Sequence, residues 1–112
     1  MSLLIITTMN AIDIEKAAGV LHRAAPEATI ILFGSQARGD ADENSDVDFL
    51  LVAPDVTSRR KEMARLSRLL RPLRIPADVL VFSRRVFDQW ASVPGTVIHT
   101  AAREGKVLYA AS

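Results

Sequence analysis

The feature that most constrains this chain is a strand-like apolar run that begins with two aspartates. Asp46 and Asp48 are separated by one valine and lead into the run from Phe49 to Val52. Side chains alternate along a β-strand, so residues two apart lie on the same face. Two carboxylates held that close repel each other unless a cation or a proton lies between them. The pattern therefore favours a divalent metal site at the start of a buried strand.

The kind of metal follows from the ligands that the sequence offers. The 112 residues include no cysteine and only two histidines, His22 and His99. A site built from carboxylates suits hard cations, so magnesium or manganese is expected. A two-metal site for phosphoryl transfer needs a third carboxylate. Asp78, near the start of a later apolar run, is the candidate, although on its own it is more simply explained as a polar strand end.

The segment before the aspartates has the composition of a turn that can hold phosphate. Gly34 ends an apolar run and Ser35 follows it. Free backbone N–H groups at such a turn attract anions, and glycine allows close approach. Gly34 and Gly39 match part of a phosphate-binding loop, but Asp40 and Ala41 stand where that loop needs lysine and serine or threonine. Taken alone, a plain turn is the simpler explanation.

Hydrophobic periodicity and capping residues predict the elements around these motifs. Helices are expected after Asn10, after Thr57 or Ser58, after Ser83 and at 96–103, and strands at 28–33, 47–52, 77–82 and 106–110. Gly105 is placed like a glycine that closes a helix in the left-handed conformation. The connection between the first two strands allows either antiparallel pairing or a parallel crossover. We predict an α+β fold, a mixed β-sheet with helices packed on it, in one domain of residues 1–112.

Charge is unevenly distributed although the net charge is only +1. Residues 40–55 contain six acids and no base, whereas residues 59–74 contain seven bases and one acid. A solvated helix face is the simpler explanation of the basic segment, and a surface for an acidic partner or for substrate phosphates is the alternative. The small net charge argues against direct nucleic-acid binding. No apolar stretch approaches the ~20 residues of a membrane span, so no membrane contact and a cytoplasmic location are expected.

Taken together, the motifs carry a family resemblance. The glycine–serine pair at 34–35, ten intervening residues and Asp-Val-Asp at 46–48 resemble the signature of the polymerase-β-like nucleotidyltransferase superfamily. The segments 34–39 and 45–49 resemble the minimal nucleotidyltransferases of bacteria and archaea, as do 93–95 and 103–109. The resemblance implies the fold of that superfamily and transfer of a nucleotidyl group, AMP from ATP above all, to an acceptor hydroxyl.

The resemblance also implies a role for each motif residue. The glycine–serine pair would hold the β- and γ-phosphates of the nucleotide. Asp46 and Asp48 would bind two Mg²⁺ ions, with Mn²⁺ as a substitute. Asp78 would be the third carboxylate, which binds a metal and helps to deprotonate the acceptor hydroxyl. Arg38 would either contact phosphate or pair with a nearby acid.

Minimal members of this superfamily resemble antitoxins that pair with a small helical HEPN-type protein, and some of them adenylylate a tyrosine of that partner. The resemblance therefore implies a HEPN-type partner, a tyrosine acceptor and an antitoxin role. No segment resembles the acceptor-binding domain of larger members, so another chain, a second copy of this one in a homo-oligomer, or an open surface would supply that site. Two alternatives are an interaction module that neutralises its partner by binding alone and a small-molecule transferase of the aminoglycoside-modifying type.

Overall fold

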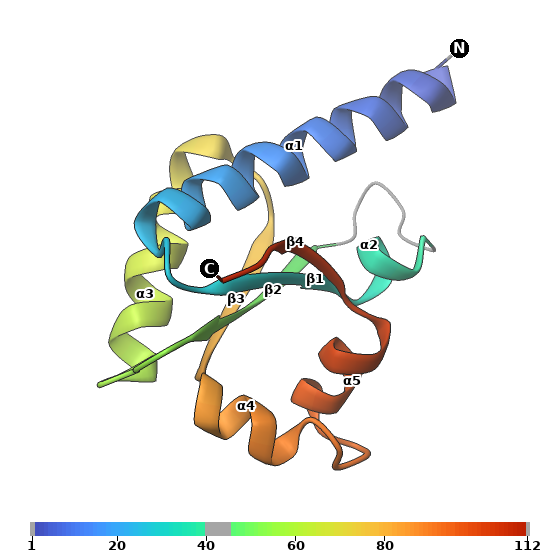
Figure 1. Cartoon of the computed structure of the whole chain (residues 1–112). Coiled ribbons are helices and arrows are strands. Elements are labelled where there is room, and N and C mark those ends of the chain that lie inside the picture. Colours follow the sequence, from blue (N-terminus) through green and yellow to red (C-terminus); the bar gives the residue numbers. More distant parts are fainter. Residues whose placement is uncertain (1, 40–45, 112) are drawn as a thin grey trace.

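The computed structural model describes residues 2–39 and 46–111, and within them a four-stranded mixed sheet carries helices on both faces (Figure 1). The strands are β1 (Thr29–Phe33), β2 (Val47–Ala53), β3 (Ala77–Ser83) and β4 (Lys106–Tyr109). The helices are α1 (Ser2–Ala24), α2 (Ser35–Arg38), α3 (Arg59–Leu70), α4 (Arg84–Trp90) and α5 (Val97–Glu104), and a short 3₁₀ turn, η1, covers Arg71–Leu73. The predicted α+β fold with a mixed sheet is confirmed.

The strands follow the order β3-β2-β1-β4 across the sheet. β1 pairs antiparallel with both β2 and β4, whereas β2 and β3 run parallel and are joined through α3. A parallel pair needs such a crossover, because the chain must return to the starting edge of the sheet. Of the two pairings that the sequence allowed for the first two strands, the structure adopts the antiparallel one.

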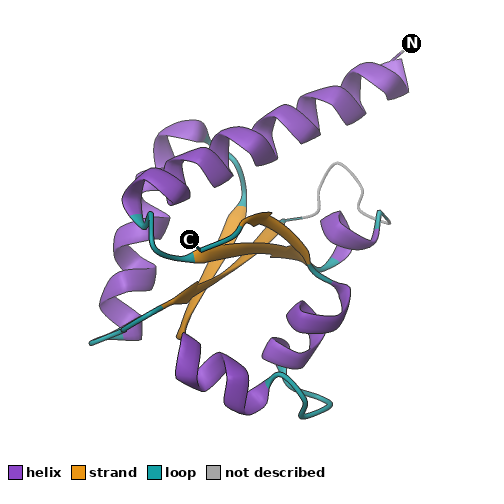
Figure 2. Ribbon diagram, viewed as in Figure 1, coloured by secondary structure: helices purple, strands orange, loops and turns teal. Residues whose placement is uncertain are grey.

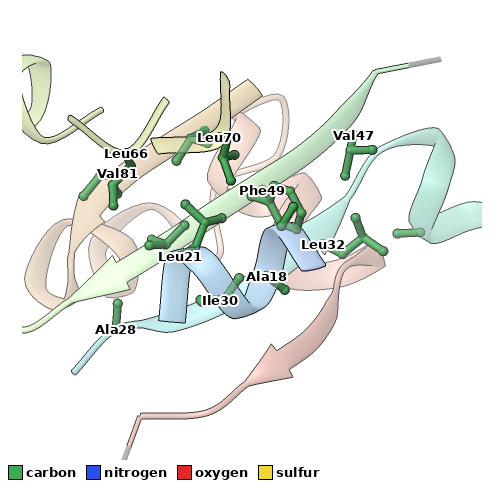
Figure 3. Packing of buried hydrophobic residues seen from close by; sticks show 14 residues of the cluster. Ala18, Leu21, Ala28, Ile30, Leu32, Val47, Phe49, Leu66, Leu70 and Val81 are labelled. Carbon is green, nitrogen blue, oxygen red and sulfur yellow. The ribbon is translucent and has the colours of Figure 1, made fainter. Parts of the chain in front are cut away.

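Helices cover both faces of the sheet (Figure 2), and a cluster of buried apolar side chains lies on each face. On one face, Phe49 of β2 is fully buried in a cluster with Leu21 of α1 and Leu66 of α3 (Figure 3). On the other face, Leu50 of β2 belongs to a second buried cluster that includes Phe87 of α4. Burying a side chain of this size contributes about 1.5–3 kcal/mol. β2 is therefore held from both sides, which keeps its first residues in a defined place.

Two of the predicted helix starts are confirmed by their caps. The Ser58 hydroxyl accepts a hydrogen bond from the Lys61 N–H at 3.3 Å, and the Ser83 hydroxyl accepts one from the Val86 N–H at 3.2 Å. Each cap satisfies a backbone donor that has no partner within its own helix. The start of α3 is important for the site because α3 leads the chain from β2 to β3.

Two predictions at element ends were wrong. α1 begins at Ser2, so Asn10 lies inside the helix instead of capping it. An asparagine inside a helix costs only about 0.5 kcal/mol, so it does not have to mark an end. Gly105 ends α5 with φ −74°, which is not left-handed. Glycine is needed there for space, because a Cβ would collide with the Ala101 carbonyl oxygen and the Ile31 side chain.

None of the helices in the described ranges is long and apolar enough to cross a membrane.

Candidate active site

The register of the sheet places two of the predicted aspartates side by side. Asp48 lies opposite Asp78 in the parallel β2–β3 pair, and opposite Phe33 at the end of β1. Neighbouring strands are about 4.8 Å apart, so side chains opposite each other on one face are close. Asp46 directly precedes β2, two residues before Asp48. The three predicted aspartates therefore gather at one end of two adjacent strands.

The charges of these carboxylates act on one another. The pKa of Asp48 is raised above its ordinary value of 3.8, first by partial burial and then by the negative charges of Asp78 and Asp46, while Arg38 lowers it. An acid whose pKa rises in this way lies in an excess of negative charge. A divalent cation at the same place would reverse the effect. The site is thus built to gain from a bound cation.

Gly34 lies directly against Asp48. Its φ is +77°, a conformation that favours glycine, and a Cβ built on it would lie 2.5 Å from the Asp48 Oδ2 atom. α2 begins at the next residue, Ser35, and the Gly34 carbonyl accepts hydrogen bonds from the Ala37 and Arg38 N–H groups, both at 3.1 Å. The predicted glycine turn and the predicted carboxylates therefore form one site. The side chain of Ser35, also predicted to hold phosphate, lies outside the described part of the structure.

Arg38 pairs with an acid from a distant segment. Its Nη1 atom donates to Glu104 Oε2 of α5 at 3.4 Å, and both side chains are nearly half exposed. An exposed pair of this kind contributes ~0–1 kcal/mol to stability. The charge of Arg38 also acts on Asp48, whose pKa it lowers. Of the two roles expected for Arg38, pairing with an acid is confirmed, and contact with phosphate stays a prediction. The sequence offered no signal for Glu104, which is distant in the chain.

A cavity of about 500 Å³ borders the carboxylates. This is within the usual range for a small-molecule site. Asp48 and Asp78 line it together with residues of α3, of β1 and β3 and of the start of α5: Arg60, Met63, Ala64 and Ser67; Phe33, Val79 and Leu80; and Val97. Sequence analysis offered residues 59–74 as a possible surface for an acidic partner or substrate phosphates, but it did not select individual residues of α3 for the site. The available signal was the helical spacing of Arg60, Ala64 and Ser67, which places all three on one face.

The donor set suits a metal held jointly by protein and nucleotide. Among the described residues, which include Asp46, Asp48 and Asp78, no group of three or more acidic or histidine side chains is placed so that it could hold a metal by itself. Mg²⁺ on a nucleotide uses one or two protein carboxylates, with phosphate oxygens and waters as its other ligands. Asp46 and Asp48, beside Asp78, match that incomplete donor set, and the raised pKa of Asp48 shows where positive charge would be favourable.

Comparison with known proteins identifies the family. The family described as nucleotidyltransferase domain matches residues 14–101, which include β1, β2, β3 and all the residues of the site described above except Glu104. The chain belongs to this family. The motif spacing predicted this membership.

A curated relative and two solved structures resemble this nucleotidyltransferase. A protein of Methanocaldococcus jannaschii named "Putative protein adenylyltransferase MJ0141" is 38% identical over 52 residues, which are 46% of this chain and 52% of that protein. The chain thus spans about half the length of this relative. A structure described as a toxin–antitoxin with AMP-PNP has a TM-score of 0.59 at 23% identity and covers 88% of this chain and 73% of its own. A mutant of the toxin–antitoxin MntA-HpeT has a TM-score of 0.56 at 22% identity, covering 88% and 72%. Both structures share the fold of this nucleotidyltransferase.

Proposed function

We propose that this nucleotidyltransferase transfers AMP from ATP to a hydroxyl group of a protein partner, with Mg²⁺ bound at Asp46, Asp48 and Asp78. The observation that carries the proposal is the contact of Gly34 with Asp48 and the pairing of Asp48 with Asp78. It brings a turn suited to phosphate against carboxylates suited to a cation. The curated relative named as a protein adenylyltransferase supports AMP and a protein acceptor.

The phosphate side of the site is the turn at Gly34. We infer that backbone N–H groups of Gly34 and Ser35, with the Ser35 hydroxyl, hold the β- and γ-phosphates. Glycine permits this approach because no Cβ lies between the backbone and the ligand. Arg38 lies one turn away and already acts on the charge of Asp48, so it adds positive charge beside the phosphates.

The carboxylates handle the reacting groups. Mg²⁺, when bound, neutralises charge on the phosphate oxygens and on the leaving group. The acceptor oxygen attacks the α-phosphorus and forms a new P–O bond. The bond between the α-phosphorus and the bridging oxygen breaks, and pyrophosphate leaves with the electron pair. Asp78, on the outermost strand, accepts the proton of the hydroxyl, and positioning of the two substrates supplies much of the remaining rate enhancement.

The partner in this proposal is a HEPN-type toxin, with a tyrosine as acceptor and this chain as its antitoxin. The tyrosine and the HEPN class come from the motif resemblance, and solved toxin–antitoxin structures with the same fold support the setting. A chain that neutralised its partner by binding alone would not need the carboxylate cluster. A small-molecule acceptor of the aminoglycoside type is the other alternative.

The test uses a candidate HEPN-type protein, chosen from the genes that neighbour the gene of this chain, incubated with ATP, Mg²⁺ and the wild type, Asp46→Asn or Asp48→Asn. We expect the intact mass of the partner to rise by one AMP with wild type and the rate to fall by at least about 100-fold in both variants, because each loses a metal ligand. Asp55→Asn, the same change at an exposed acid beyond the far end of β2, is the matched control and should keep the rate.

Neutralisation of the partner should be measured in the same samples. If Asp46→Asn stops AMP transfer but still neutralises the partner fully, binding is the function and the proposal is wrong. Transfer to an aminoglycoside and not to the protein would favour the small-molecule alternative.

A further inference from the structure

Three positions of the site follow one another across the sheet. Gly34 comes at the end of β1, Asp48 lies in the neighbouring β2, and Asp78 lies in β3 at the edge of the sheet. In phosphoryl transfer the attacking and leaving oxygens lie roughly in line on opposite sides of the phosphorus. With the leaving phosphates at Gly34, as in the proposed function on which this inference rests, the acceptor has to arrive from the β3 edge.

The cavity borders this same edge, because Asp78, Val79 and Leu80 of β3 line it. Arg60, Ala64 and Ser67 of α3 form one row of exposed side chains that line it together with Asp78. We call these three residues the α3 row. Two of them are small, so they leave space between the helix and the strand. Leu80 and other apolar side chains form the remaining wall. The hollow therefore suits a ligand with an apolar body and a polar end directed at the carboxylates.

Arg60 differs from two other arginines of α3, Arg59 and Arg65. Arg59 donates to the Val81 carbonyl at 2.6 Å and stacks over the Phe82 ring, so it closes the edge of β3. Arg65 pairs with Glu62 at 2.6 Å. By contrast, the Arg60 side chain is exposed and forms no hydrogen bond or ion pair with any other residue that the structure describes. Lys61 and Arg68 share this property, but among the cations of α3 in the described ranges only Arg60 also lines the cavity.

The cavity has negative charges on its strand side and a positive charge on its helix side. Asp78, which is exposed, and Asp48, which is partly buried, lie on the strand side of the cavity, and Arg60 lies on the helix side. Four further cations, all exposed, extend the positive charge along α3 and the turn after it: Lys61, Arg68, Arg71 and Arg74. An acceptor with its own acidic groups would be repelled by the aspartates and attracted by Arg60. Such a ligand can therefore dock in only one orientation.

We propose that the α3 row and the β3 edge form the docking surface for the acceptor, and that the acceptor is a protein segment with acidic residues beside its hydroxyl-bearing side chain. The apolar wall accommodates the body of that side chain, and Arg60 binds a neighbouring carboxylate. A protein fits this surface better than RNA. The described part of α3 offers no aromatic ring on which bases could stack, and the one aromatic residue among the cavity-lining residues that the structure describes, Phe33, is buried. RNA phosphates would also lie against two aspartates.

The first experiment measures binding without catalysis. Short fluorescent peptides that contain one tyrosine flanked by glutamates, by lysines or by serines are titrated with the protein in the presence of Mg²⁺ and a non-hydrolysable ATP analogue. We expect the wild type to prefer the glutamate peptide by about tenfold, as one charge-assisted contact would give. Arg60→Glu should lose or reverse this preference. Arg85→Glu, the same charge change at an exposed arginine of α4 outside both the cavity lining and the α3 cations, should keep it.

The second experiment fills the hollow. Ser67→Trp places a large ring in the cavity at an exposed helix position, where the fold should tolerate it. We expect AMP transfer to the glutamate peptide, followed by mass spectrometry, to be lost while affinity for the ATP analogue is retained. Undiminished transfer in Ser67→Trp would place the acceptor elsewhere and overturn the inference.

The remaining outcomes separate this inference from the proposed function. If the analogue binds, Asp48→Asn weakens it, and yet Arg60→Glu leaves all peptide affinities unchanged, the inference is wrong and the proposed function stands. If Arg60→Glu weakens the analogue as much as the peptide, Arg60 is a nucleotide contact and the inference is also wrong. Tighter binding of a single-stranded RNA, lost in Arg60→Glu, would make this a nucleic-acid surface. If the protein does not bind the ATP analogue at all, both the inference and the proposed function are wrong.

Discussion

Asp48 is the residue at which folding and function are expected to oppose each other. Its raised pKa means that the folded protein binds a proton there more readily than the unfolded chain. The ionised form therefore destabilises the fold, an effect that is absent below the ordinary pKa of 3.8 and fully present above the raised pKa. Because of this contribution, the free energy of unfolding falls as the pH rises from the ordinary pKa to the raised pKa of Asp48. Other carboxylates with lowered pKa, such as Glu62, act in the opposite direction.

Asp48→Asn should consequently stabilise the protein in the absence of metal. We expect a gain of about 0.5 kcal/mol at neutral pH, the size of a like-charge pair on neighbouring strands, and no gain well below the ordinary pKa. Urea unfolding of wild type, Asp48→Asn and the control Asp55→Asn across the acid-to-neutral range measures it. A variant less stable than wild type at neutral pH would show that the carboxylate supports the fold, contrary to this account.

Replacing Gly34 gives a second test at the scale of one residue, because its positive φ and its closeness to Asp48 both exclude a side chain there. Gly34→Ala introduces strain at positive φ and a clash with the Asp48 carboxylate. Gly95→Ala has the same strain at φ +87° with nothing within 4 Å. We expect Gly95→Ala to lose about 1–2 kcal/mol and Gly34→Ala to lose more, together with affinity for Mg²⁺ and the ATP analogue. If Gly34→Ala and Gly95→Ala lose the same stability and Gly34→Ala keeps its nucleotide affinity, the contact between Gly34 and Asp48 is not important for the site.

At the scale of elements, α5 is fitted closely to β1 at one point. Gly105→Ala would push a methyl group into Ile31 of β1 and the Ala101 carbonyl. Overpacking of this kind costs about 1–3 kcal/mol. Gly19→Ala, inside α1 with only ordinary contacts around the new Cβ, should instead stabilise by about 0.5–1 kcal/mol. Chemical denaturation of the two variants should therefore shift the midpoint in opposite directions, and a shift of Gly105→Ala toward higher stability would refute the packing argument.

The strand edge shows why part of the basic segment is structural. β3 pairs only with β2 among the described strands, so its outer carbonyls face away from the sheet. Arg59 binds one of them, at Val81. Edges left open in this way invite unwanted pairing, and a charged side chain discourages it. The solvated-face explanation of the segment is thus too simple, since Arg59 and Arg65 have specific contacts while Arg60 faces the cavity.

For the whole molecule, the fold should not depend on metal. The two core clusters are apolar, and the carboxylates lie at strand ends outside them. A chelator should therefore leave the unfolding temperature of the free protein unchanged or slightly higher. Mg²⁺ with the ATP analogue should raise stability by about 2.7 kcal/mol at 100 times the dissociation constant.

Thermal scans with analogue alone, Mg²⁺ alone and both together measure this linkage. The stabilisation should need both and should be lost in Asp48→Asn. If the chelator unfolds the protein, the metal is part of the fold and the incomplete donor set described here is the wrong interpretation.

The sequence alone identified the strands, the helix caps at Ser58 and Ser83, and the family, because these depend on short-range rules. Alternation, capping and the spacing from Gly34 to Asp48 are properties of neighbouring residues, and the family match confirms their interpretation. The roles assigned to Asp46, Asp48 and Asp78, and the single-domain organisation of residues 1–112, stay predictions.

Only the tertiary structure decided which segments meet. It paired β1 with β2 antiparallel, brought Asp78 opposite Asp48, joined Arg38 to Glu104 and placed Arg60 at the cavity. These contacts join residues far apart in the chain, and their formation depends on how two apolar clusters fill the space on either side of one sheet. A local sequence pattern indicates on which face of an element a side chain lies. Which residue it contacts on another element depends on the packing of the whole chain.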